Sequence, residues 1–155
     1  MIEIITDQAE KKAIAREILE ALTDWFEVTE SREAYIAQSA EQIFLAAKEN
    51  GRAAGFLCLK ETGRATVELA VMGVRKEYHR QGIGTALVTA AKEIARREGY
   101  AFMQVKTVQM GKYPEYDLTN LFYLHCGFAE FEVIPTLWDT ENPCQIYVLA
   151  LEVIA

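Results

Sequence analysis

Apolar residues recur along the chain with two different periods, which predict the order of its helices and strands. Ile14, Ile18 and Leu22 recur at helical spacing after Asp7, a residue suited to cap a helix N-terminus. Short apolar runs between turn residues indicate strands at 2–5, 42–48, 52–60, 65–74, 102–108, 128–137 and 145–153. Helices are expected from Asp7 to Trp25, over 32–40, from Gly82 to a glycine cap at Gly99, and over 117–126.

The resulting order, β-α-α-β-β-β-α-β-α-β-β, predicts an α/β fold with a mixed sheet. Turns at 49–51 and 61–64 join consecutive strands as antiparallel hairpins, whereas the helix after Gly82 makes a β-α-β crossover. We therefore expect a mixed, mostly antiparallel central sheet with flanking helices. The chain has 155 residues and shows neither a linker nor a repeat, so we expect a single domain over 1–155.

The composition of the chain argues against several kinds of binding partner. The net charge is -7 and the basic residues are dispersed, which argues against nucleic acid or an anionic membrane as a partner. No apolar run approaches the length of a membrane span, and the first residues do not resemble a signal peptide, so we expect a cytoplasmic protein. Cys58, Cys126 and Cys144 have no close spacing, which favours reduced thiols and predicts no metal site.

A glycine-rich turn carries the main chemical signal. Residues 78–87, YHRQGIGTAL, leave a predicted strand and enter a predicted helix. Backbone N–H groups of such a turn, together with the unpaired N–H groups of the first helical turn, can hold a phosphate. The P-loop pattern is absent, and Leu87 stands where a dinucleotide fingerprint needs a third glycine. Gly82-x-Gly84 alone fits a phosphate cradle or a tight turn without a ligand.

Three segments together resemble the GNAT superfamily of acetyl-CoA-dependent N-acetyltransferases. They are the apolar strand 67–74, which contains one glutamate and one glycine, the loop 79–84, and the run 123–128, YLHCGF. The superfamily shows Arg/Gln-x-x-Gly-x-Gly/Ala after the strand and Tyr-x-x-x-Gly-Phe on a later helix. The element order fits from Ile2 to Val153. The chain departs from the pattern at His79, where Arg or Gln is usual, and at Tyr116, where many members have Asn.

The resemblance implies an acetyl-CoA cosubstrate and direct attack by an amine without a covalent enzyme intermediate. The pantetheine arm would pair with the backbone at Met72 and Val74, and an N–H near Met72 would polarise the thioester carbonyl. Glu68 is then the candidate base, acting through water, or else a solvent-facing strand residue. Tyr123 is the candidate acid for the CoA thiolate and a cofactor contact, or else an aromatic that packs on pantetheine. The pyrophosphate would lie on the N–H groups of Arg80, Gln81, Gly82, Ile83, Gly84 and Thr85.

The resemblance also places an acceptor amine between the early helices and a loop at 136–144. A small-molecule amine is the first expectation; a protein N-terminus or lysine, or a non-catalytic CoA-binding regulatory module, are the alternatives. Members often pair through their last strands, so a homodimer is expected. Runs such as 24–26, 106–108 and 142–144 look like a bacterial branch of the superfamily. The candidate pocket residues, each equally plausible as ordinary core or surface, are Asp24, Trp25, Phe26, Trp138, Asp139 and Glu141.

Overall fold

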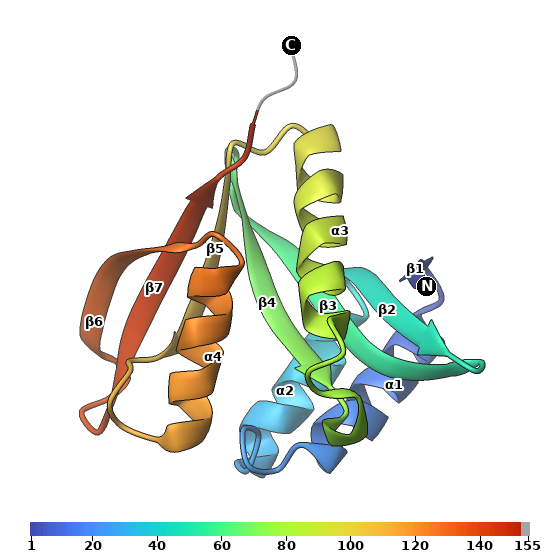
Figure 1. Cartoon of the computed structure of the whole chain (residues 1–155), viewed down its shortest axis with the longest axis horizontal. Helices are drawn as coiled ribbons and strands as arrows, with labels where there is room; N and C mark the ends of the chain where they lie inside the picture. The colour runs from blue at the N-terminus through green and yellow to red at the C-terminus, as the bar shows by residue number, and fades with distance from the viewer. Residues whose placement is uncertain (153–155) are drawn as a thin grey trace. The chain divides into compact units, whose positions relative to one another are not determined.

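The computed structural model describes residues 1–152, and the predicted order of elements is confirmed there, with one short 3-10 helix, η1, added (Figure 1). The elements are β1 (Ile2–Ile5), α1 (Gln8–Ala21), α2 (Thr29–Ser39), β2 (Ile43–Glu49), β3 (Arg52–Gly63), β4 (Thr66–Val74), η1 (Lys76–Tyr78), α3 (Ile83–Arg97), β5 (Phe102–Val108), α4 (Pro114–His125), β6 (Ala129–Asp139) and β7 (Asn142–Ala150). None of the helices in this part of the chain has both the length and the apolar character needed to cross a bilayer.

Some predicted boundaries differ from those in the structure. The turn expected at 61–64 is mostly strand, because side-chain hydrogen bonds from Tyr100 to Glu61 and from Gln104 to Thr62 hold that segment extended. Helix α4 begins at Pro114, since proline without an N–H is well suited to the first helical turn. The last strand was predicted to end at Val153, which lies outside the described residues.

The fold class is confirmed as mixed α/β. The strands follow the hydrogen-bonded order β1-β2-β3-β4-β5-β7-β6. Strands β4 and β5 run parallel, while the pairs β1–β2, β2–β3, β5–β7 and β6–β7 are antiparallel. Residue contacts divide the described chain into two compact units, 1–60 with 69–94 and 61–68 with 95–152. That residues 1–155 form a single domain stays a prediction.

In the first unit, helices cover both faces of the sheet. Phe44 and Phe56 stack with ring centroids 5.3 Å apart in a core that also contains α1 residues such as Ile18. On the other face of β3, a Cβ added at Gly55 would meet the Leu87 side chain of α3 at 3.3 Å. Because successive residues of a strand point to opposite faces, α1 and α3 lie on opposite sides of the sheet.

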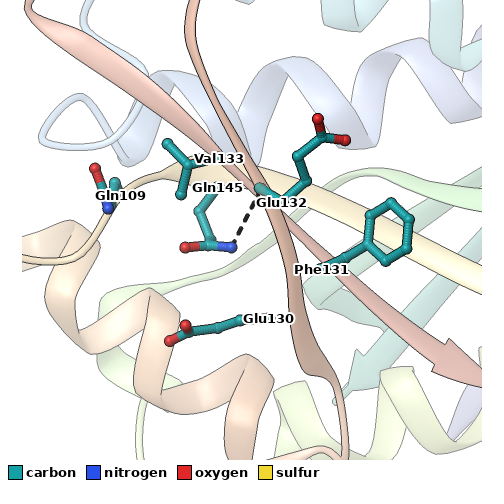
Figure 2. A pocket seen from close by; sticks show the side chains of 6 residues that line it. All are labelled: Gln109, Glu130, Phe131, Glu132, Val133 and Gln145. Carbon is teal, nitrogen blue, oxygen red and sulfur yellow. Dashed lines mark hydrogen bonds between the residues drawn. The ribbon is translucent and has the colours of Figure 1, made fainter.

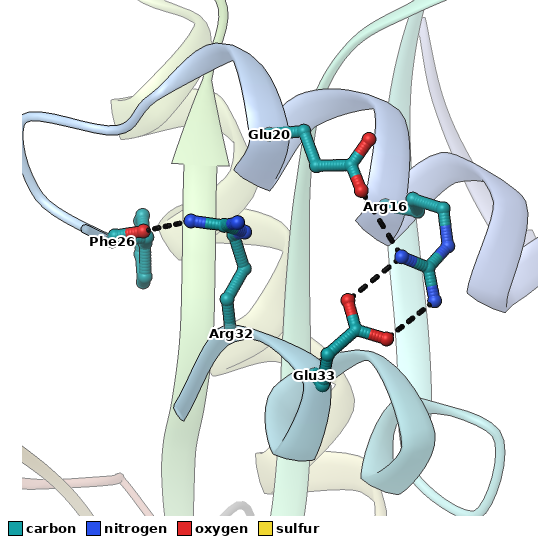
Figure 3. Close-up of polar contacts among 5 residues, drawn as sticks. All are labelled: Arg16, Glu20, Phe26, Arg32 and Glu33. Atoms are coloured by element: carbon teal, nitrogen blue, oxygen red, sulfur yellow. Dashed lines mark hydrogen bonds and ion pairs between the residues drawn. The ribbon is translucent and has the colours of Figure 1, made fainter. Parts of the chain in front are cut away.

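The first two helices are joined by ion pairs. Arg16 of α1 makes a two-pronged contact with Glu33 of α2, at 2.7 and 2.8 Å, and also bonds Glu20 (Figure 3). The hydrogen bond from Arg16 lowers the pKa of Glu33. Arg32 donates to the Phe26 carbonyl at 2.7 Å, which fixes the connection between the helices.

In the second unit, a buried polar group fastens α4 to the sheet. The Tyr147 hydroxyl donates to Asn120 Oδ1 at 2.6 Å, and Asn120 Nδ2 donates to the carbonyls of Val108 and Tyr116. Asn120 and Tyr147 are fully buried, so these bonds satisfy groups that have no access to water. Helix α4 therefore covers the face of β5 and β7 that carries Tyr147.

Gly73 shows why a glycine stands inside β4. A Cβ at this position would lie 3.0 Å from Ile18 of α1 and 2.9 Å from Leu22, the residue that caps the end of α1; both side chains are buried. The glycine therefore permits a close approach of α1 to the strand.

We expect Gly73→Ala to lower the free energy of unfolding by about 1–3 kcal/mol, because the added methyl overpacks the core. Gly63→Ala is the matched control, since its added Cβ meets nothing within 4 Å. Urea denaturation of both variants measures the difference, and equal stabilities would show that the α1 contact is easily relaxed.

Candidate cofactor and catalytic site

Arg75 fixes the point at which the chain leaves β4. Its backbone N–H donates to the Ala54 carbonyl and its Nε donates to the Ala53 carbonyl, both at 2.8 Å. Its Nη2 forms a 2.6 Å ion pair with Glu17 of α1. Arg75 is buried, so one side chain joins β3, α1 and the end of β4.

The Glu17 carboxylate responds to this contact. Desolvation alone would raise the pKa of Glu17, but the hydrogen bond and charge of Arg75, with a further contribution from Arg52, lower it. Glu17 therefore stays ionised opposite Arg75 at neutral pH.

His79 closes the turn that follows β4. Its Nε2 lies 2.7 Å from the Val74 carbonyl, and its ring makes an edge contact with Trp25 at 6.0 Å between centroids. The residue that replaces the usual Arg or Gln thus holds the turn by contacts within the first unit. Trp25, proposed as a wall of the acceptor pocket, here packs against this histidine.

The glycine loop has the backbone geometry of an anion cradle. Arg80 has φ +65° and Gly82 has φ +81°, and both residues are exposed. Alternation of left-handed residues with ordinary ones turns successive N–H groups toward a common point. Helix α3 begins directly afterwards at Ile83, so the N–H groups of its first turn, including those of Gly84 and Thr85, add donors and partial positive charge.

The other predicted cofactor residues of the first unit follow the same strand. Burial alternates along the end of β4: Met72 and Val74 are half-buried, whereas Val71 and Gly73 are buried. Gln81 donates to the Glu77 carbonyl at 3.2 Å, so its side chain stabilises the loop itself.

Glu68 belongs to the second unit and is not solvent-facing, so that alternative was wrong. Its side chain is 9% exposed, and its Oε1 accepts a hydrogen bond from Lys106 Nζ at 3.0 Å. The parallel register pairs Glu68 with Gln104, two residues before Lys106 on β5. The sequence analysis did not identify Lys106. A signal was available, because a lysine inside a mostly apolar strand, on the same face as Gln104, indicates a possible partner for a buried acid.

Tyr123 lies on α4, also in the second unit, and is buried among aromatic rings. Its ring centroid lies 5.6 Å from that of Phe122, 5.8 Å from that of Phe128 and 6.0 Å from that of Tyr147. The register places Val105 and Tyr147 on one face of the sheet and Lys106 on the other. Tyr123 and Glu68 therefore approach this part of the sheet from opposite faces.

The candidate acceptor residues are divided between the two units. In the first unit, Asp24 makes a 2.8 Å ion pair with Lys76, and Phe26 packs on Tyr35. In the second unit, the loop expected at 136–144 is a tight hairpin instead, because β6 and β7 extend to Asp139 and from Asn142. The Asp139 carboxylate accepts the N–H groups of Glu141 and Asn142, which closes this turn. Trp138 beside it is 46% exposed.

Cys58, Cys126 and Cys144 are buried, and none of them forms a disulfide bond within the described residues. Burial raises the pKa of the Cys58 thiol strongly, and it also raises that of Cys144, although Lys106 lowers the latter in part. The thiols of Cys58 and Cys144 are therefore protonated at neutral pH, which makes them poor nucleophiles. Within residues 1–152, no three His, Cys, Asp or Glu side chains gather as a metal-binding group.

An open cavity of about 290 Å³ lies in the second unit beside β6 (Figure 2). Gln145 donates to the Glu132 carbonyl at 3.3 Å at its edge. None of the predicted catalytic or cofactor residues lines it. The lining residues are Gln109, Glu130, Phe131, Glu132, Val133 and Gln145.

Comparison with solved structures identifies the fold. A GNAT-family protein from Desulfovibrio desulfuricans matches with a TM-score of 0.87 and 18% identity, over 98% of this chain and 99% of that one. The ribosomal-protein-S18-alanine N-acetyltransferase from Escherichia coli matches with a TM-score of 0.78 and 18% identity, over 100% and 97%. An aminoglycoside 6'-N-acetyltransferase complexed with coenzyme A matches with a TM-score of 0.75 and 15% identity, over 100% and 99%.

Comparison of the sequence with models of protein families shows which family the chain belongs to. The comparison with curated proteins found no match. The model of the acetyltransferase (GNAT) family matches residues 12–128, which include β4, the glycine loop and Tyr123. This match covers well over half of the chain, and the protein therefore belongs to the acetyltransferase (GNAT) family.

Proposed function

We propose that the protein is an N-acetyltransferase that transfers the acetyl group of acetyl-CoA to a primary amine by direct attack in a ternary complex. The observation that carries this proposal is the loop with Arg80 and Gly82 in left-handed conformation at the start of α3. Such a loop suits a pyrophosphate, and coenzyme A supplies one. Membership of the acetyltransferase (GNAT) family supports transfer of an acetyl group as the reaction.

The first unit supplies the cofactor contacts in this proposal. The N–H groups from Arg80 to Thr85 hold the pyrophosphate. The pantetheine amides pair with the backbone of β4 at Met72 and Val74, as an added strand would. The Met72 N–H donates to the thioester oxygen and stabilises its negative charge during attack.

Gly82→Ala should weaken acetyl-CoA binding by about tenfold or more, because a Cβ at φ +81° displaces the N–H groups that hold the pyrophosphate. Gly99→Ala is the matched control: Gly99 also has positive φ, and an added Cβ meets nothing within 4 Å at either position. Both variants lose similar stability. Calorimetric titration should show weaker binding only for Gly82→Ala, and equal affinities would contradict the cradle.

Glu68 acts as the general base, directly or through a water, because a free amine is almost wholly protonated at neutral pH. The hydrogen bond from Lys106 Nζ to Oε1 at 3.0 Å supports a fixed orientation of this carboxylate.

Glu68→Gln should reduce turnover by about 100-fold or more while acetyl-CoA affinity changes little, since the amide keeps the size but cannot accept the proton. Steady-state rates and calorimetry measure the two effects separately. Turnover equal to that of the wild type would eliminate Glu68 as the base.

Tyr123 donates the proton to the departing CoA thiolate in this mechanism. Its aromatic neighbours, Phe122, Phe128 and Tyr147, fix the ring, which supports a defined position for the hydroxyl.

Tyr123→Phe should lower kcat by about tenfold or more, because the packed ring remains and only the hydroxyl is removed. Stopped-flow detection of free CoA measures this rate. If the variant is as fast as the wild type, Tyr123 serves packing alone.

A small-molecule amine is the proposed acceptor. The net charge of -7 favours a cationic molecule. One solved structure of similar fold is an aminoglycoside 6'-N-acetyltransferase, and another is a ribosomal-protein-S18-alanine N-acetyltransferase. The test is release of free CoA thiol with a panel of polyamines, amino acids, aminoglycosides and peptides. Release with peptides alone would favour a protein acetyltransferase, and binding of CoA without release would favour a regulatory module.

A homodimer in the cytoplasm completes the proposal. Strand β6 is the last in the sheet order, and Phe131, Leu137 and Trp138 on it are 46–67% exposed. An edge strand with exposed apolar side chains suits pairing with a second copy. Sedimentation equilibrium distinguishes the dimer from a monomer.

The buried thiol side chains of Cys58 and Cys144 suit a reducing compartment.

A further inference from the structure

We propose that Lys106 is a positioning residue for the candidate base: its ammonium keeps the buried Glu68 carboxylate ionised and holds it by one oxygen. This inference rests on the proposed function, because it assigns a role in the same reaction. Lys106 itself touches neither the acceptor amine nor the cofactor in this role.

The geometry of the second unit brings the two side chains together. Lys106 on β5 reaches Glu68 on β4, and Nζ lies 3.0 Å from Oε1. The parallel register pairs Glu68 with Gln104, so Glu68, Gln104 and Lys106 share one face of the sheet. Gln104 is itself held by a 2.9 Å hydrogen bond to Thr62. The ion pair therefore lies on the face of β4 and β5 that also carries Gln104. This face is opposite the one that α4 covers.

Burial gives the ion pair its importance. The Glu68 side chain is 9% exposed, while that of Lys106 is 28% exposed. A carboxylate removed from water favours its protonated form unless an opposite charge lies close to it. A protonated carboxyl cannot act as a base. In this proposal the positive charge of Lys106 favours the carboxylate form of Glu68, and that form can accept a proton.

One carboxylate oxygen is left for the reaction. Lys106 contacts Oε1, and Oε2 has no hydrogen-bond partner among residues 1–152. During attack the proton moves from the ammonium of the acceptor to Oε2, directly or through a water, and the free amine then attacks the thioester carbonyl. As the C–N bond of the amide forms, the C–S bond breaks; the nitrogen gives up its second proton, and the CoA thiolate takes a proton from Tyr123, which regains one from the nitrogen or from solvent.

Two other titratable groups of the second unit stand near the pair. The Cys144 thiol is buried, and its pKa is raised by burial first, lowered by Lys106 and raised by Glu68. Glu132 on β6 pairs in register with Ile146, which in turn pairs with Lys106, but its side chain is exposed. A neutral thiol and an exposed carboxylate do not replace the ammonium, so Lys106 is the cation that sets the ionisation of Glu68.

The first experiment compares pH–rate profiles of Lys106→Met, Lys106→Arg and Lys112→Met. Lys112 is an exposed lysine of the same unit, so its variant loses the same charge away from Glu68. Lys106→Met should lose about tenfold or more in kcat/KM at neutral pH, and the acidic limb of its profile should move up by about one pH unit or more. Lys106→Arg should restore the rate to within about threefold, because the charge is kept. Thermal unfolding and acetyl-CoA titration verify that each variant is folded.

The second experiment needs no substrate. Titration of carboxyl-¹³C-labelled glutamates by NMR follows Glu68 directly, its signal being the one that Glu68→Gln removes. The midpoint should rise by about one pH unit or more in Lys106→Met and stay unchanged in Lys112→Met. An unchanged midpoint in Lys106→Met overturns the inference whatever the enzyme does.

The two experiments separate this inference from the proposed function. If the wild type acetylates no amine, the proposed function fails, and with it the catalytic role of Lys106. If the wild type is active and Lys106→Met keeps its rate and its pH profile, only the inference fails. Reduced activity without a shifted profile and without rescue by arginine would indicate a structural role and would also overturn it.

Discussion

The turn that follows β4 depends on one buried guanidinium. Arg75 bonds two consecutive carbonyls of β3 with its backbone N–H and its Nε, and pairs with Glu17 of α1 through Nη2. These contacts fix the direction in which the chain leaves the strand. A residue such as Arg80 at φ +65° is strained, and it is tolerated only where the surroundings determine the backbone. Arg75 and His79 supply those surroundings.

The chemistry is distributed along β4 and beyond it. Glu68 is the last residue of the second unit on this strand, and Met72 and Val74 follow in the first unit before the glycine loop. A single strand thus carries the proposed base, the proposed oxyanion donor and the entry to the phosphate cradle in that order. These groups lie within a short stretch of sequence, inside the residues that the family model matches.

The sequence was sufficient for the features that depend on local rules. Hydrophobic periodicity predicted every long helix and strand in the correct order, since apolar spacing follows the period of each element. The loop from Arg80 to Thr85 followed from its glycines and from the helix after it. The hairpin at Asp139 was missed because its stability comes from one carboxylate that accepts two N–H groups, and aspartate is common in loops as well.

The features that depend on tertiary contacts were not predictable. The Glu68–Lys106 pair requires the register of two parallel strands that are far apart in sequence. The anchoring of Arg75 requires the positions of β3 and α1. The sequence shows that β4 contains Gly73, but not which side chains approach it. Its neighbours, Ile18 and Leu22, appear only when α1 is packed on the strand.

Calorimetric titration of the wild-type chain with acetyl-CoA tests the central claim most directly, because the cradle formed by the loop and α3 is the observation from which the function is derived. Binding at one site per chain with micromolar affinity, and similar binding of free CoA, is the predicted result. Absence of binding at millimolar cofactor would contradict it, and would leave a GNAT-family fold whose glycine loop serves only as a tight turn.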